Sequence, residues 1–253
     1  MSIFHSLQRL ISTDSTAEHS AGKATPPPLH GKWVIFSGAG LSRESGLATF
    51  RSKDGLWANH SIKEVCHAST WRANRQKVND FYEQRWQEIQ AAQPHAGHEW
   101  CVAMEQRGAL LITQNIDTLL ERAGAKRVLH VHGRIDCWQC FECSHIWERE
   151  ESAPTHCPAC LSDDIRVDVV FFGERARGYR AMEHYLRSLG HEDTLVIIGT
   201  TGQVVNPLLW LQARPRVIVV DPQPAAELTP WADVEIAQVP ASQLPRLYPA
   251  KAQ

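Results

Sequence analysis

The sequence lacks a long apolar run, an excess of basic residues and any internal repeat. No hydrophobic stretch approaches the roughly 20 residues that cross a bilayer, so we predict no membrane partner. Lys and Arg total 26 against 28 Asp and Glu, a formal charge of -2, and we therefore predict no nucleic-acid partner. What is present is a chain of 253 residues, 43% of them hydrophobic, which can bury the core of one or two domains.

The start of the chain also lacks an export signal. Its first eleven residues have neither a charged start nor a long apolar segment, so we predict a cytoplasmic protein, with a mitochondrial presequence as the alternative. Residues 1–28 contain Ser, Thr and Ala and end in three prolines, Pro26 to Pro28, which predicts a flexible tail followed by a stiff joint. We expect the fold to begin near Leu29.

Cysteines are few, and their spacing is uneven. Of the seven, Cys66 and Cys101 stand alone and are expected to be ordinary buried or half-buried thiols. The other five lie within the 24 residues from Cys137 to Cys160. Because a reducing compartment leaves thiolates available as ligands, this clustering indicates a metal site and not disulfides.

Two CxxC pairs define that site. Cys140 with Cys143 and Cys157 with Cys160 are separated by thirteen residues, a spacing typical of a structural zinc ion in a closed tetrahedron. Cys137 with Cys140 is also a CxxC pair and remains an alternative, as do free thiols or a redox pair. Six acidic residues in this segment argue against a phosphate partner; they are Glu142, Glu148, Glu150, Glu151, Asp163 and Asp164.

Short apolar segments recur along the chain, each followed by polar residues or glycine. Continuous apolar strands that alternate with helical patterns predict an α/β fold with a parallel sheet covered on both faces. The expected strands are Trp33–Phe36, Leu110–Thr113, Val128–His130, Val167–Phe171, Leu195–Ile198 and Val217–Val220. Between Ile62 and Gly108 the pattern changes to polar and aromatic helices, which predicts a helical module beside the sheet.

The first of these strands opens into a glycine turn. Gly38 and Gly40 let the backbone bend sharply and approach a pyrophosphate, so nucleotide binding is the first functional hypothesis. A dehydrogenase pattern needs a third glycine at position 43, where Arg43 stands, and an acidic residue roughly 20 residues on; neither is present. A turn that only connects a strand to a helix remains the alternative. The segment through Gly55 and Trp57 is predicted to be a loop that closes over a ligand.

Polar residues follow two later strands. Gln114, Asn115 and Asp117 come directly after one of them, where open α/β sheets bind ligands, and they suit a ribose or a carboxamide. Capping of the next helix is the alternative role for the Asn and the Asp. His132 follows another short strand and is a candidate general base, because imidazole titrates near neutrality. His130 is expected to be structural.

Several segments occur in a fixed order: GAGLSRESG with TFR, TQNID, RAG, HVHG, the two CxxC pairs, VVFFGE and GTTGQVVNP. Together they resemble the sirtuin (Sir2) family, most closely its bacterial class III members, over residues 32 to about 245. The resemblance implies a Rossmann-type parallel-sheet domain and a smaller zinc-ribbon and helical domain. The first would comprise residues 29–61, 108–136 and 166–250, the helical module 62–107 and the zinc ribbon 137–165.

The resemblance also implies roles for individual residues. His132 would be the catalytic base, with Asn115 and Asp117 beside it. NAD would be contacted by Gly38, Ala39, Gly40, Ser42, Phe50, Arg51, Trp57, Gln114, Asn115, Ile116, Asp117, Gly199, Thr200, Thr201, Asp221 and Ala241. A substrate peptide would pair, as an added strand, with Val170, Phe171, Phe172, Gly173 and Glu174, and zinc would be held by Cys140, Cys143, Cys157 and Cys160.

The implied reaction consumes NAD. The acyl oxygen of an acylated lysine attacks the ribose carbon as nicotinamide leaves, and His132 then takes a proton from a ribose hydroxyl so that the sugar captures the acyl group. The products would be free lysine, nicotinamide and O-acyl-ADP-ribose, and the partners acylated-lysine proteins or peptides. Transfer of ADP-ribose to protein, or NAD hydrolysis, is the enzymatic alternative, and a non-catalytic NAD sensor is a third hypothesis.

Tyr82 and Arg85 are three residues apart and so share one helical face. The pair resembles the acyl-pocket signature of class III sirtuins, in which a phenol and a guanidinium bind the carboxylate of a succinyl or malonyl group; surface packing is the alternative. Arg43 stands where these members usually have Ala, which predicts a narrower or more positive acyl tunnel. Asp221 replaces the family's usual Asn and is still expected to accept ribose hydroxyls.

Overall fold

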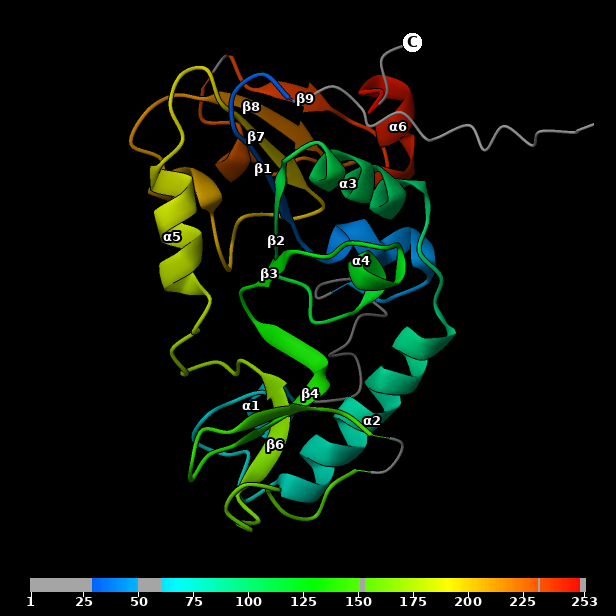
Figure 1. Cartoon of the computed structure of the whole chain (residues 1–253), viewed down its shortest axis with the longest axis vertical. Coiled ribbons are helices and arrows are strands. Elements are labelled where there is room, and N and C mark those ends of the chain that lie inside the picture. Colours follow the sequence, from blue (N-terminus) through cyan, green and yellow to red (C-terminus); the bar gives the residue numbers. More distant parts are fainter. Residues whose placement is uncertain (1–28, 50–60, 151–152, 232, 251–253) are drawn as a thin grey trace, which may run out of the picture.

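The structure, a computed structural model, describes residues 29–49, 61–150, 153–231 and 233–250. It has two lobes, a larger one built on a parallel sheet and a smaller one built on an antiparallel sheet (Figure 1). The predicted flexible tail over residues 1–28 lies outside the described residues. Within the described ranges, no helix has the length and apolar character needed to cross a bilayer.

Among the described residues, six parallel strands form the larger sheet, in the order β3-β2-β1-β7-β8-β9. Their bounds are β1 Trp33–Ser37, β2 Leu110–Thr113, β3 Val128–His130, β7 Thr194–Ile198, β8 Arg216–Val220 and β9 Glu235–Ala237. Val, Ile and Leu dominate the central strands, because both faces of a parallel sheet are buried. β1 lies in the middle and pairs with β2 on one side and β7 on the other.

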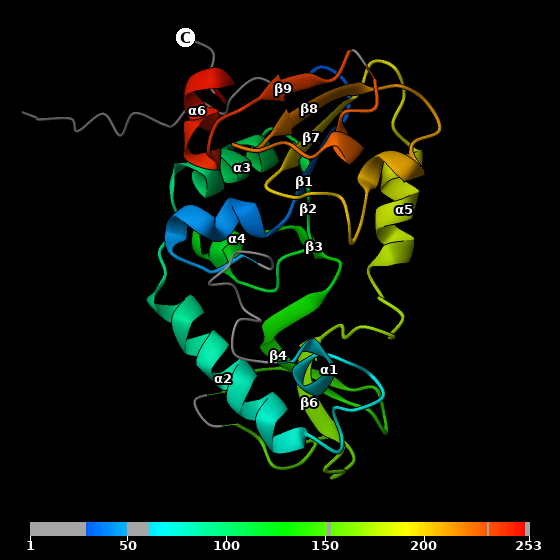
Figure 2. The same cartoon turned by 180° about the vertical axis from the view of Figure 1, so that it is seen from behind.

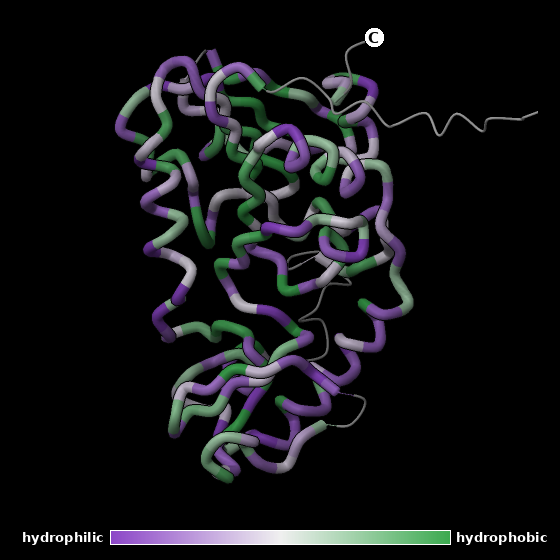
Figure 3. The backbone as a smooth tube through the Cα atoms, viewed as in Figure 1, coloured by the Kyte–Doolittle hydropathy of each residue, from purple (hydrophilic) through white to green (hydrophobic). Residues whose placement is uncertain are grey.

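Alternate residues of these strands face opposite sides of the sheet, and each side has its own core. On one face of the sheet, Ile35 packs in a core that includes Trp100. This face is covered by α3 Ala96–Gln106, α4 Leu119–Arg122, η4 Ala241–Gln243 and α6 Leu244–Leu247. On the other face, Phe36 packs in a core that includes Met182. This face is covered by α5 Tyr179–Arg187, η2 Pro207–Trp210 and η3 Ala226–Leu228. Figure 3 shows hydrophobic segments through the centre of this lobe and hydrophilic ones along its outer loops.

The smaller lobe contains a three-stranded antiparallel sheet, counted over the described ranges, in the order β5-β4-β6. Its elements are β4 Gly133–Cys140, β5 Ile146–Glu148, β6 Ile165–Val169, α1 Ile62–Val65 and α2 Arg75–Ala91. Both views show α2 running along this sheet (Figure 2). Val78 and Ile89 of α2 are fully buried and pack in one core with Ile135 and Val167 of the sheet.

Two expected elements differ in the structure. The strand predicted over Val167–Phe171 is β6, which begins at Ile165 and pairs antiparallel with β4, so it does not join the parallel sheet. All five residues of β6 are buried, and burial alone does not reveal which sheet a strand joins. The expected helical module is divided, because α2 packs on the small sheet and α3 on the parallel one.

Candidate active site

A cavity of about 1200 Å³ opens at the carboxyl ends of β1, β2, β7 and β8 and extends to the small lobe. Its walls include every predicted catalytic, NAD-binding and substrate-binding residue that the structure describes: Gly38, Ala39, Gly40, Ser42, Tyr82, Arg85, Gln114, Asn115, Ile116, Asp117, His132, Val170, Phe171, Phe172, Gly173, Glu174, Gly199, Thr200, Thr201, Asp221 and Ala241. Phe50, Arg51 and Trp57 lie outside the described residues.

The glycine turn after β1 lies against the end of β7. The N–H of Gly38 donates to the Ile198 carbonyl at 2.9 Å, and that of Gly40 to the Gly199 carbonyl at 2.8 Å. A Cβ on Gly40 would lie 2.5 Å from the Cα of Gly199, so only glycine permits this approach. These two N–H groups are therefore committed within the protein, and the first effect of the glycines is to bring two strand ends together. The turn continues as a 3-10 helix, η1 Ala39–Ser45.

Ser42 of η1 joins two residues that follow β2. Its hydroxyl donates to Asp117 Oδ2 at 2.8 Å and accepts from Asn115 Nδ2 at 3.1 Å, and all three side chains are buried. Burial raises the pKa of the Asp117 carboxyl, while the hydrogen bonds from Ser42 and from the Leu119 N–H lower it. Asp117 Oδ1 accepts from that N–H at 3.1 Å, although the N-cap of α4 is Thr118 and not Asp117.

His132 lies between β3 and β4, and its side chain lines the cavity. Nδ1 is 3.1 Å from the carbonyl oxygen of Gln114, which only accepts, so the proton is assigned to Nδ1 and the lone pair to Nε2. Nε2 lies 3.2 Å from the hydroxyl of Tyr179. Burial lowers the pKa of His132, although the Gln114 carbonyl raises it. The ring is therefore neutral at neutral pH, which is the form that a general base needs.

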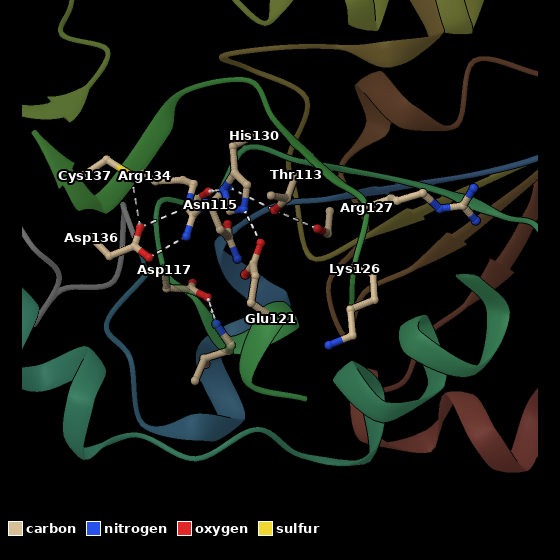
Figure 4. A network of polar contacts seen from close by, with 12 residues as sticks. Thr113, Asn115, Asp117, Glu121, Lys126, Arg127, His130, Arg134, Asp136 and Cys137 are labelled. Carbon is tan, nitrogen blue, oxygen red and sulfur yellow. Dashed lines mark hydrogen bonds and ion pairs between the residues drawn. The ribbon is translucent and has the colours of Figure 1, made fainter. Parts of the chain in front are cut away.

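His130 has a different environment (Figure 4). Its Nδ1 is 2.9 Å from the Asn115 carbonyl and its Nε2 is 2.7 Å from Glu121 Oε1. Burial tends to raise the pKa of Glu121, but its hydrogen bond with His130 leaves it lowered overall, so this carboxylate is an acceptor. Both ring nitrogens are engaged, and His130 ties β3 to the segment after β2, as its structural interpretation predicts.

The candidate metal centre lies in the small lobe. The Sγ atoms of Cys140, Cys143, Cys157 and Cys160 all lie within 4.8 Å of one another, and the Cys140–Cys160 and Cys143–Cys157 pairs are each 3.6 Å apart. Zn–S bonds of about 2.3 Å give tetrahedron edges of about 3.8 Å, so four thiolates at these distances fit zinc. Cys137 is not in the group, and its Sγ donates to Asp136 instead. Four protein ligands leave no open position, which makes this site structural.

Comparisons with known proteins bear on the same residues. The Sir2 family pattern matches residues 38–207. The chain belongs to the Sir2 family. This sirtuin is 42% identical over 178 residues to the NAD-dependent protein deacylase of Campylobacter jejuni subsp. jejuni serotype O:2, covering 68% of this chain and 75% of that protein. It is 38% identical over 209 residues to the NAD-dependent protein deacylase of Helicobacter hepaticus, covering 74% and 82%.

Solved structures agree with the assignment. A mutant Sir2 homologue in complex with ADP-ribose matches with a TM-score of 0.73 and 30% identity over 85% of this chain and 89% of that one. A Sir2 homologue in complex with NAD matches with a TM-score of 0.71 and 30% identity over 85% and 86%. The predictions of sirtuin membership and of an α/β fold with a smaller lobe bearing a four-cysteine site are confirmed.

Tyr82 and Arg85 lie at the small-lobe end of the sirtuin cavity, and both are buried. Surface packing, the alternative role for this pair, is therefore wrong. The Tyr82 hydroxyl donates to Cys66 Sγ at 3.4 Å, and its ring stacks on Phe171 with centroids 5.6 Å apart. Arg85 pairs with Glu88 at 2.8 Å, and its buried Nε has no hydrogen-bond partner among the described residues.

Arg43 lines the cavity, and its charge acts on Asp221 at the end of β8. Burial raises the pKa of the Asp221 carboxyl, and the Gln223 N–H and the Arg43 guanidinium partly offset that effect. The structure thus associates Arg43 with the predicted adenosine end of the sirtuin site. The predicted effect of Arg43 on the acyl tunnel stays a prediction.

The segment from Val170 to Glu174 uses most of its N–H groups within the protein. Val170 donates to the His132 carbonyl, and Phe172 to the Cys66 carbonyl, while the Phe171 N–H is held by Glu174 Oε2. Glu174 in turn is paired with the buried Arg166 at 2.9 Å. Glu174 therefore shapes the segment.

Two residues of the sirtuin cavity have no signal in the sequence. Cys66 is buried as expected, but it lies beside Tyr82, sixteen residues away, and is not an isolated core thiol. Tyr179 reaches His132 from α5, 47 residues further along the chain. Both are brought to the cavity by tertiary packing, which no local pattern reports.

Proposed function

We propose that this chain is an NAD-dependent protein-lysine deacylase that releases nicotinamide and O-acyl-ADP-ribose and accepts succinyl and malonyl as well as acetyl groups. One observation carries the proposal: a single cavity holds an imidazole with its lone pair on Nε2, at His132, and a buried guanidinium, at Arg85. The relatives named NAD-dependent protein deacylases and the homologue bound to NAD support the class of reaction.

The strand-end residues fit NAD. Ser42, Asn115 and Asp117 form one connected hydroxyl, amide and carboxylate group that suits a ribose. Asp221, at the end of β8, lines the same cavity and suits the second ribose. NAD supplies the electrophilic ribose carbon and the hydroxyl that captures the acyl group. His132 would take the proton of that hydroxyl on Nε2, because Nδ1 is committed to Gln114.

Arg85 supports the acidic acyl groups. Arg85 lines the cavity with a buried guanidinium, and a carboxylate entering the cavity would accept a charge-assisted hydrogen bond from it. Tyr82 adds a phenol on the same wall. Glu88 already neutralises part of the Arg85 charge, so acetyl groups are also expected to be accepted.

The substrate backbone would add beside Val170 to Glu174. Among the described residues, Gly173 has the only N–H of this segment that donates no hydrogen bond to the protein. A peptide held by one such donor and by neighbouring carbonyls is recognised through its main chain, which makes selection among side chains loose.

The test is to incubate the protein with NAD and matched acetyl-lysine and succinyl-lysine peptides and to follow the masses of peptide and nucleotide. Wild type is expected to remove both groups and to form O-acyl-ADP-ribose, and His132→Ala to remove neither. Arg85→Met should lower succinyl removal by about 10- to 100-fold, the effect of losing a charge-assisted bond, and acetyl removal by much less.

Other products would point to other activities. A protein that gains the mass of ADP-ribose would indicate ADP-ribosyl transfer, and free ADP-ribose with unchanged peptide would indicate NAD hydrolysis. Equal losses of acetyl and succinyl removal in Arg85→Met would reject the acidic-acyl assignment while leaving deacylation intact.

A further inference from the structure

Tyr179, the first residue of α5, lies at the nitrogen through which His132 is expected to act. We propose that Tyr179 is a positioning residue for this base: its hydroxyl holds the imidazole so that the Nε2 lone pair stays directed into the cavity until NAD arrives. This inference rests on the proposed function, because it concerns how the base is prepared for its step.

The hydrogen bonds of the ring define the role of Tyr179. Since the Gln114 carbonyl fixes the proton on Nδ1, Nε2 accepts, and the Tyr179 hydroxyl 3.2 Å away is the donor. Burial raises the pKa of the Tyr179 phenol, so this hydroxyl keeps its proton at neutral pH. The ring of His132 is thus held at both nitrogens. If the ring tilted or flipped, it would lose the hydrogen bond to Gln114, the one to Tyr179, or both.

The fold itself delivers Tyr179 to this place. A Cβ on the preceding Gly178 would lie 2.7 Å from the Cα of Val131 and 2.9 Å from the His130 carbonyl oxygen, so the start of α5 lies directly against the segment before His132. Met182 and Leu186 of the same helix are fully buried in the core of the large lobe. The hydroxyl is therefore held by a packed helix and a close backbone contact.

The step at which Tyr179 acts follows from the reaction. Departure of nicotinamide needs no base, whereas capture of the acyl group needs Nε2 to take a proton from a ribose hydroxyl. That hydroxyl replaces the phenol as the partner of Nε2. An imidazole of His132 that is already aligned can accept this proton without first reorienting. Tyr179 therefore affects acyl capture and leaves the first step unchanged.

The experiment separates the two steps. Exchange of labelled nicotinamide into NAD in the presence of acylated peptide reports the first step, and formation of free lysine peptide reports the whole reaction. We expect Tyr179→Phe to slow product formation by about 3- to 10-fold, the effect of one lost hydrogen bond, with exchange unchanged. Tyr185→Phe, which alters an exposed tyrosine of the same helix, should change neither rate.

Each outcome decides the inference. Product formation in Tyr179→Phe that is unchanged or faster would overturn it, and so would a parallel fall of exchange and product formation, since that pattern reports damage to the fold. Unchanged exchange shows in the same assay that the variant is folded and binds NAD and peptide. If His132→Ala keeps full product formation, the proposed function itself fails, whatever Tyr179→Phe does.

Discussion

At the scale of single residues, Arg85 forms an ion pair with Glu88 and also lines the cavity that is expected to receive the substrate. Its side chain is buried in the small lobe, where an unpaired charge is costly, and Glu88 one helical turn away supplies the neutralising carboxylate at 2.8 Å. A substrate carboxylate in the cavity would compete with Glu88 for the same guanidinium. Under the proposed acidic-acyl assignment, the preference among acyl groups is expected to depend on Glu88 as well as on Arg85.

Glu88→Gln is expected to shift the preference toward acidic acyl groups. Glu88 is 45% exposed, so its pair with Arg85 is worth only about 0.2–1 kcal/mol, and the ratio of succinyl to acetyl kcat/KM should rise about 1.4- to 5-fold. The matched control is Glu64→Gln, which removes an exposed pair with Lys77 in the same lobe. A ratio that stays constant or falls in Glu88→Gln would contradict this explanation.

At the scale of elements, β4 links the candidate base to the small lobe. β4 begins at Gly133, directly after His132, and pairs there with Val169 of β6. Gly133 has φ +79°, and a Cβ at this position would lie 1.9 Å from the Asp168 carbonyl oxygen. The register of the small sheet and the position of the imidazole therefore depend on the same backbone contact.

Gly133→Ala is expected to destabilise the protein and to reduce turnover. Gly108→Ala is its control, because Gly108 has a similarly positive φ of +107° and nothing within 4 Å of the added Cβ. Strain alone should cost Gly108→Ala about 1–2 kcal/mol in the free energy of unfolding, measured with urea. Gly133→Ala should cost more, since the β4 and β6 backbones must also separate; equal losses would show that the contact does not matter.

Some elements of the fold can be predicted from the sequence and others cannot. The strand-end residues Gln114 to Asp117 and the glycine turn could be predicted, because turn chemistry and the ends of apolar strands are local signals. The prediction that residues 167–171 join the parallel sheet is wrong, since the buried residues of β6 suit either sheet. No sequence pattern predicts β9, because this strand has only three residues and its Ile236 is exposed. Tyr179 and Cys66 reach the cavity through packing between elements distant in sequence.

At the scale of the whole molecule, two lobes meet at one cavity. The parallel sheet supplies the wall predicted for NAD, and the small lobe supplies Tyr82 and Arg85. The small sheet holds few buried residues around its cysteines, where Cys140 and Cys157 pack with Ile165 and the partly buried Trp147. A core this small gains stability from a bound metal, so zinc held by the four cysteines would support one side of the cavity from a distance.

Cys157→Ser is expected to lose zinc and stability together. Metal analysis should find one zinc per chain in wild type and much less in this variant, with a lower Tm and reduced deacylation. Cys137→Ser is the matched control, because Cys137 lies outside the four-thiol group and should keep the metal. Loss of zinc from Cys137→Ser with retention in Cys157→Ser would reverse the assignment of ligands.

The order of strands in the large sheet has a consequence for how the protein is made. β1 pairs with β2, which begins 77 residues later at Leu110, and with β7, which begins at Thr194. During synthesis the β1-β2-β3 half can assemble early, but its inner edge stays unpaired until the ribosome has released residue 198. Because unpaired strand edges promote aggregation, the free edge of β1 is the part of the growing sheet that is most open to wrong pairing until β7 has been made.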